Sequence, residues 1–151
     1  MDYHSFLVKV EDSFKSSGFI KAEKAPARID LAMGKQWMRS LFTFAFLKGD
    51  GLTRVEINNI LDEVFTRMGD KKAPFIFPLL LRGSKSTILV FVFEEPSDFE
   101  WILSEAKRKK FMGKSYVASW VINLKTGTLH KNKGLPKITG IGEQEVKKAL
   151  L

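Results

Sequence analysis

The side chains that most often act as catalytic bases or metal ligands are scarce in this sequence. It contains no Cys and only two His, His4 and His130, which stand in unrelated segments without acidic residues at metal-ligand spacing. Thiol catalysis and thiolate metal sites are therefore excluded, and we expect neither a metal nor a cofactor. No Gly-x-Ser-x-Gly elbow is present, so a serine hydrolase of that kind is not indicated.

The densest group of acidic residues comprises Glu94, Glu95, Asp98 and Glu100. Such a group is typical of a solvated strand end and helix N-terminus, where negative charge is favoured. A metal-dependent nuclease would need converging carboxylates, commonly with a lysine nearby. Asp30 lies in a predicted strand, but the next strand offers Phe46-Leu47-Lys48, which has the lysine without the acid. The sequence does not predict a nuclease centre.

One segment has the ending of a phosphate-binding P-loop, Gly113-Lys114-Ser115. The loop also requires a glycine five residues before Gly113, and that position is Arg108. A P-loop further needs a strand before it and a helix after it, whereas the order expected here is the reverse. We interpret the segment as a turn into a strand.

Positive charge is concentrated in the last third of the chain. Residues 105–151 contain eleven Lys/Arg and three Asp/Glu, a net charge of +8, while residues 1–104 contain 14 of each and are neutral. This asymmetry indicates a polyanionic partner, with nucleic acid the first expectation and an anionic membrane surface the second. A solvated, lysine-rich surface that keeps a small protein in solution would have the same composition.

The C-terminal segment adds a pattern to this charge. Gly140-Ile141-Gly142, followed by Lys147 and Lys148, resembles the second half of a helix-hairpin-helix motif. In that family a Gly-apolar-Gly turn opens the second helix and offers backbone N–H groups to a DNA phosphate. The alternative is a glycine-flanked turn that docks a terminal helix. The candidate nucleic-acid-binding residues are Lys107, Arg108, Lys109, Lys110, Lys131, Lys133, Lys137, Gly140, Gly142, Lys147 and Lys148.

Hydrophobic periodicity predicts alternating helices and hairpins. Helices are expected at 3–17, 53–68, 97–107 and 143–150, the second opened by a Thr53–Glu56 capping box. Two hairpins are expected, 28–33 with 38–47 around Gly34-Lys35-Gln36, and 74–82 with 86–94 around Gly83-Ser84-Lys85. A further strand at 116–124 precedes a turn and a short return strand at Leu129.

These elements predict a single α+β domain over residues 1–151, with 132–151 as a loosely attached basic segment. The sheet is expected to be predominantly antiparallel and built from hairpins, with helices mainly on one face. The order also contains a ferredoxin-like βαββαβ core, and sequence alternation does not separate the two. The basic-Gly-aromatic octamer of RNA-recognition motifs is absent, so the phenylalanines of these strands are expected in the core, namely Phe42, Phe44, Phe46, Phe91 and Phe93.

The function predicted from sequence is a non-enzymatic binding module that contacts nucleic acid through its basic third. One alternative is a protein-interaction or assembly module that uses a strand edge at 75–82. Another is an enzyme acting on an anionic small substrate, with Asp98 or Glu94 as base. No signal-peptide pattern or membrane-length apolar run is present, and with no cysteine we expect a soluble, cytoplasmic protein.

Overall fold

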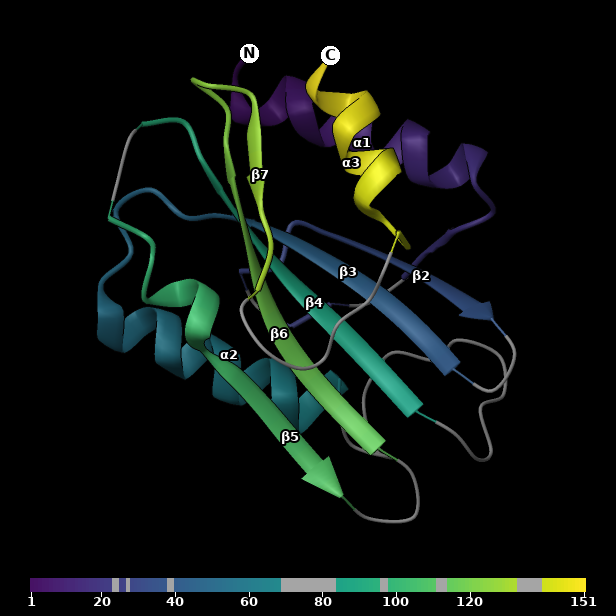
Figure 1. The fold of residues 1–151 in the computed structure, drawn as a ribbon, viewed down its shortest axis with the longest axis vertical. Helices are drawn as coiled ribbons and strands as arrows, with labels where there is room; N and C mark the ends of the chain where they lie inside the picture. Colours follow the sequence, from purple (N-terminus) through teal and green to yellow (C-terminus); the bar gives the residue numbers. More distant parts are fainter. Residues whose placement is uncertain are drawn as a thin grey trace.

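The strands of the chain form one mixed sheet, and most of them are apolar segments (Figure 1). The computed structural model describes residues 1–22, 25–26, 28–37, 40–68, 84–95, 98–110, 114–132 and 140–151. In chain order the elements are α1 (Tyr3–Ser16), β1 (Ile20–Lys21), β2 (Leu31–Trp37), β3 (Ser40–Lys48), α2 (Arg54–Met68), β4 (Ser84–Phe93), the 3₁₀ turn η1 (Ile102–Ser104), β5 (Ala106–Lys110), β6 (Lys114–Asn123), β7 (Thr128–His130) and α3 (Glu143–Leu150).

The centre of the sheet is parallel. The strand order is β1-β2-β3-β4-β6-β5, with β7 also paired to β6. β3, β4 and β6 run parallel to one another, and the remaining neighbours are antiparallel. The α+β class is confirmed, but the predominantly antiparallel sheet is wrong and the ferredoxin-like core is not confirmed. The sequence of β4 contains a signal for the parallel centre, since Ile88–Phe93 is an unbroken apolar run. Every residue of this run is buried, because parallel strands are covered on both faces.

Helices cover both faces of the sheet, so the prediction of helices mainly on one face is also wrong. α1 and α3 pack on one face, where Phe6, Phe14 and Val146 join a layer with Phe44 and Phe46 of β3. α2 and η1 pack on the other face against the alternate residues of the same strands. Of the five phenylalanines predicted in the core, four are buried and Phe42 is partly buried against it.

Of the helix predicted at 97–107, the described residues 98–107 form no α-helix. Phe99, Ile102 and Leu103 have helical spacing, but only the 3₁₀ turn Ile102–Ser104 forms, with Ile102 and Leu103 buried. The backbone becomes extended at Glu105 (φ −81°, ψ 123°), and the next five residues pair with β6 as β5. The periodicity was misleading because an open edge of β6 provides backbone partners that local sequence does not reveal.

The first predicted hairpin is confirmed, although its turn was placed too early. Gly34, Lys35 and Gln36 lie inside β2 and pair with β3, and the pairing continues to Trp37 opposite Ser40. For the second hairpin, the predicted strand 74–82 lies outside the described residues. Ser84 and Lys85, which were predicted in its turn, belong to β4.

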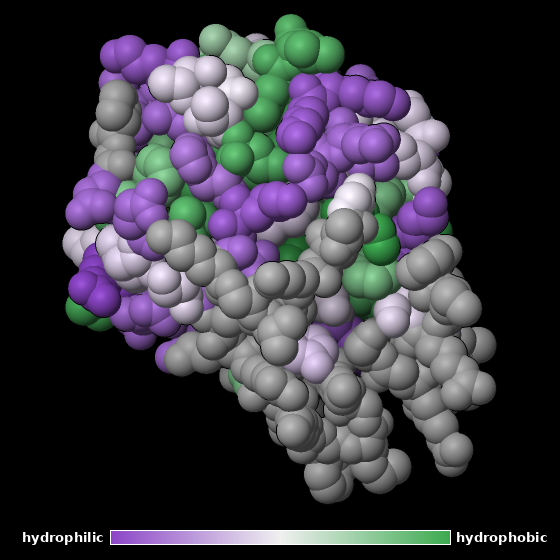
Figure 2. Space-filling view, in the orientation of Figure 1, coloured by the Kyte–Doolittle hydropathy of each residue, from purple (hydrophilic) through white to green (hydrophobic). Residues whose placement is uncertain are grey.

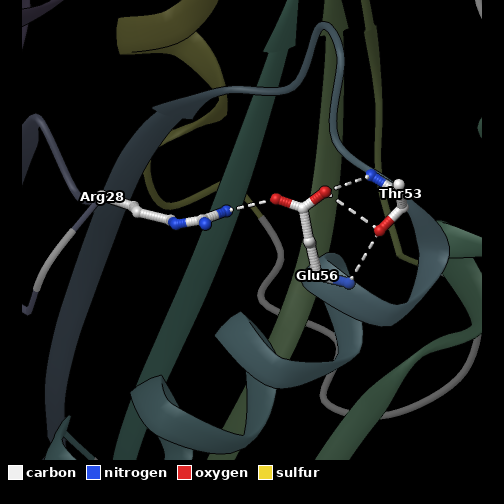
Figure 3. A network of polar contacts seen from close by, with 3 residues as sticks. All are labelled: Arg28, Thr53 and Glu56. Atoms are coloured by element: carbon white, nitrogen blue, oxygen red, sulfur yellow. Dashed lines mark hydrogen bonds and ion pairs between the residues drawn. The ribbon is translucent and has the colours of Figure 1, made fainter.

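Three of the predicted helices are confirmed at 3–16, 54–68 and 143–150, as are β6 and its return strand β7. The capping box at the start of α2 is present, since the Glu56 N–H donates to Thr53 Oγ1 at 3.2 Å and the Thr53 N–H donates to Glu56 Oε1 at 3.2 Å (Figure 3). Arg28 donates to the other oxygen of Glu56 at 2.9 Å. The Arg28 guanidinium, followed by the Thr53 donors, holds the pKa of Glu56 below its usual 4.5.

The C-terminal helix packs against the first helix and the sheet (Figure 1). Val146 and Ala149 are buried in the same layer as α1. Ser13 Oγ of α1 donates to the backbone carbonyl of Glu145 at 2.8 Å. These contacts fix the position of α3 and of the basic residues that it carries.

Candidate nucleic-acid interface

The run Lys107–Lys110 forms most of β5, at one edge of the sheet (Figure 1). In the ladder with β6, Lys110 lies opposite Lys114 and Lys109 lies opposite Ser115. Ser115 is in turn opposite Lys85 of β4. The backbone therefore brings six cationic residues of three neighbouring strands to one corner of the sheet. We call this set the β5 strip: Lys85, Lys107, Arg108, Lys109, Lys110 and Lys114.

No acidic residue lies within the three strands that contribute the β5 strip. The sequences of β4, β5 and β6 contain no Asp or Glu. Neighbouring strands are about 4.8 Å apart, and the ladder pairs position 110 with position 114, both of which are lysine.

The strand conformation removes one structural explanation for this charge. Cations in the last turn of a helix are favoured by the helix dipole, but Lys107–Lys110 are in a strand, which has no comparable dipole. Lysine on an edge strand also discourages pairing with other chains. β5 has four consecutive cationic residues, on both faces of the strand.

Sequence reasoning found Lys107–Lys110 and missed Lys85 and Lys114. Each of the missed lysines stands at the start of an apolar strand, at positions that looked like turns. Their relation to β5 depends on the pairing of β4 with β6 and of β6 with β5. The turn chemistry of single segments carries no information about such pairing.

A second group of candidate residues lies around α3, on the opposite side of Figure 1 from β5. Lys131 and Lys147 both pair with Glu143, each with an Nζ to carboxylate distance of 2.9 Å. The hydrogen bond from Lys147, followed by that from Lys131, holds the pKa of Glu143 below its usual 4.5. Lys148 lines a shallow hollow beside Lys9 and Asp12. Lys133 and Lys137 lie outside the described residues.

The glycines of the helix-hairpin-helix resemblance form the entry to α3. Gly140 and Gly142 have φ values of +81° and +80°, a conformation that favours glycine. Gly142 is packed against the Phe44 ring, where a Cβ would not fit, so its smallness has a packing reason. Glu143 and Glu145 occupy the first turn of the helix, and their negative charge disfavours a phosphate there.

Figure 2 shows the face that carries α3 and β7. Hydrophilic residues cover much of its described surface, and apolar residues gather near the top, where Figure 1 places both termini. Met1 and Leu151 are among the exposed apolar residues, with 48% and 94% of their surface accessible.

Two acidic residues that directly follow β4, Glu94 and Glu95, have structural partners. Glu94 pairs with Lys48 at 2.6 Å, and Glu95 lies 3.9 Å from Lys125. The Asp50 carboxylate accepts the backbone N–H groups of Glu94 and Glu95 at 2.9 and 3.1 Å. These contacts join the loop after β3 to the end of β4.

Within the described ranges, no group of three His, Asp or Glu residues is placed to hold a metal ion. His130 packs on the Phe99 ring with 4.7 Å between ring centroids, while His4 lies in α1. Among the described helices, none has the length and hydropathy needed to cross a membrane. Comparison of the chain with protein-family models, with curated proteins and with solved structures finds no match.

Proposed function

We propose that this protein is a binding module that contacts the phosphate backbone of nucleic acid through the β5 strip. The observation that carries the proposal is the pairing of β4, β6 and β5, which gathers six cationic residues on three strands that contain no acid. Lysine and arginine that neutralise phosphates release counterions, and this release drives association without regard to sequence.

The binding mode is expected to be sequence-independent. Base sequence is read by side chains placed in a groove by a projecting helix, ribbon or loop. β5 is an edge strand that continues the sheet, and charge on a sheet edge suits contacts to a phosphate chain. Affinity should therefore fall steeply with salt and vary little with base composition.

The test neutralises the charge of β5 and compares the result with a matched loss of charge elsewhere. The first variant replaces four residues of the strip: Lys107→Gln, Arg108→Gln, Lys109→Gln and Lys110→Gln. The control removes four charges around α1 and α3: Lys9→Gln, Lys131→Gln, Lys147→Gln and Lys148→Gln. Fluorescence anisotropy with duplex and single-stranded DNA of mixed sequence, at several salt concentrations, gives the affinity and its salt slope.

The β5 variant should lose most of its affinity at low salt. On duplex DNA its slope of log K against log salt should fall by about 3 to 4, since each phosphate contact contributes about 0.9. The control variant should keep the slope of the parent protein. The proposal is abandoned if the parent protein does not bind at low salt, or if both variants lose affinity equally. Thermal unfolding of both variants shows whether they are folded.

A further inference from the structure

A pocket of about 290 Å³ lies where α3 meets the β2–β3 hairpin. Phe19, Phe42 and Ile141 form its apolar wall. Lys35 and Glu145 also line it, together with the glycines of the turn before α3. The volume is at the small end of the range for ligand pockets, which suits one flat ring system.

The charges of the pocket favour a neutral ring over an anion. The Lys35 ammonium donates to the Ser17 carbonyl at 2.8 Å and lies 5.7 Å from the centroid of the Phe19 ring. Glu145, in the first turn of α3, brings a negative charge to the other side. The two opposite charges leave the pocket close to neutral, and Glu145 disfavours a phosphate there. A nucleobase is uncharged and has an apolar face that can lie on an aromatic wall.

Phe42 is the aromatic residue best placed for such stacking. It is the one phenylalanine of the five predicted in the core that is not fully buried. Its side chain packs against the core cluster and also lines the pocket. The ring is thus held in place by the protein and can be reached from the pocket, so a base would not have to order it on binding.

The register of the sheet connects this pocket to the β5 strip. One row of paired positions crosses the sheet from the pocket to its edge, namely Lys35 of β2, Phe42 of β3, Ser86 of β4, Tyr116 of β6 and Arg108 of β5. Paired positions of neighbouring strands lie on the same face of a sheet. The row therefore joins two partly exposed aromatic residues, Phe42 and Tyr116, to a member of the β5 strip on one face.

We propose that the nucleic acid bound by this protein is single-stranded. One unpaired base stacks on Phe42 in the pocket, another stacks on Tyr116, and the phosphates of the same strand lie on the β5 strip. This inference rests on the proposed function, to which it adds the kind of strand. β3 and β5 are three strand spacings apart, about 14 Å, which about four nucleotides span at the 3.4 Å rise of a stacked strand.

A duplex does not fit this arrangement. Its bases are already paired and stacked, so placing one in the pocket would require unpairing and unstacking it. Stacking on an aromatic ring is also tolerant of base identity, because every base has a π-face. Single-strand binding of this kind therefore agrees with the sequence independence expected of the β5 strip.

The first test uses the parent protein and two single strands of equal length and charge. One is oligothymidylate, and the other is an abasic strand that has the same phosphates without bases. Fluorescence anisotropy should give the abasic strand a Kd at least about tenfold higher, because the stacking of one base contributes that much or more. In NMR spectra the amides of Ile141 and Gly142 should shift with oligothymidylate, and should not shift with the abasic strand or with a duplex.

The second test compares two variants that each replace one partly buried phenylalanine. Phe42→Leu removes the ring from the pocket, whereas Phe99→Leu removes one that packs on His130 and on the cluster at the other face of the sheet. Phe42→Leu should weaken oligothymidylate about tenfold and leave the duplex Kd within about twofold. Phe99→Leu should leave both Kd values within about twofold. Thermal unfolding shows whether each variant is folded.

The inference is overturned if the abasic strand binds the parent protein as tightly as oligothymidylate, or if a duplex shifts the pocket amides as oligothymidylate does. Equal effects of the two folded variants overturn it as well. If all strands bind with a steep salt dependence and the bases make no difference, the contact of phosphates with the β5 strip stands and the stacking is wrong. If no strand binds at low salt, the proposed function fails together with this inference.

Discussion

One side-chain hydrogen bond ties the N-terminal helix to the sheet. Tyr3 Oη donates to Asp30 Oδ2 at 2.6 Å. Burial raises the pKa of Tyr3 above its usual 10.0, and the bond to Asp30 acts in the same direction because the ionised phenol would lose it and face a carboxylate. The folded state therefore favours the protonated phenol. This stabilisation is fully present below the usual tyrosine pKa and is lost as the pH rises above it.

The Tyr3→Phe variant tests this contribution. Near pH 8 it should reduce the free energy of unfolding by about 1 kcal/mol, because the hydrogen bond is lost. Near pH 11 the difference from the parent protein should shrink. In the parent protein Tyr3 ionises in the unfolded state and stays protonated in the folded state, which lowers the free energy of unfolding, and the variant has no such group. Urea unfolding at both pH values measures the two differences. A difference that does not change with pH would contradict the assignment.

The capping box at Thr53 gives a second prediction for a single residue. Thr53 Oγ1 accepts the Glu56 N–H at 3.2 Å, which satisfies one of the unpaired donors of the first turn of α2. Thr53→Ala should reduce the free energy of unfolding by about 1 kcal/mol, and Thr53→Ser should be close to the parent protein because it keeps the acceptor. Equal losses in the two variants, measured by urea unfolding, would show that the methyl group matters instead.

At the scale of elements, the entry to α3 provides a matched pair of glycines. Both Gly140 and Gly142 have positive φ, so alanine at either position is strained by about 1–2 kcal/mol. A Cβ at Gly140 meets open space, whereas one at Gly142 meets the Phe44 ring. Gly142→Ala should therefore cost about 1–3 kcal/mol more than Gly140→Ala, the usual range for overpacking. The difference in urea midpoint checks this, and equal effects would mean that α3 shifts freely on the sheet.

Local signals in the sequence predicted the elements that depend on local physics. The Thr53–Glu56 spacing located the start of α2, and the glycine-flanked turn located α3 at Glu143–Leu150. β5 was missed because its extended form depends on backbone pairing with β6, which competes with a helical pattern of apolar residues. The turn of the first hairpin was misplaced because Gly34 looked like a turn residue, although it lies within β2.

At the scale of the molecule, sequence alternation did not determine the direction of the strands. Antiparallel and parallel neighbours show the same alternation, and only the fully apolar run Ile88–Phe93 indicated a strand covered on both faces. The candidate interface was predicted in part. Charge counting identified the cationic run of β5, but its union with Lys85 and Lys114 follows from strand order. The pairing of Lys147 with Glu143, four residues apart on a helix that the sequence predicts, is a local signal, whereas Lys131 meets Glu143 only through folding.

The position of β6 determines how the neutral and basic parts of the chain depend on each other. The boundary between them falls near residue 104, yet β6, which belongs to the basic part, lies beside β4 of the neutral part for nine consecutive residue pairs. A fragment that ends near residue 104 would lack β6. One edge of β4 would then have no backbone partners and would expose apolar residues to water, which favours aggregation. The charge that is proposed to meet nucleic acid therefore depends on β6: Lys114 lies on that strand, and the four cationic residues of β5 are held by pairing with it.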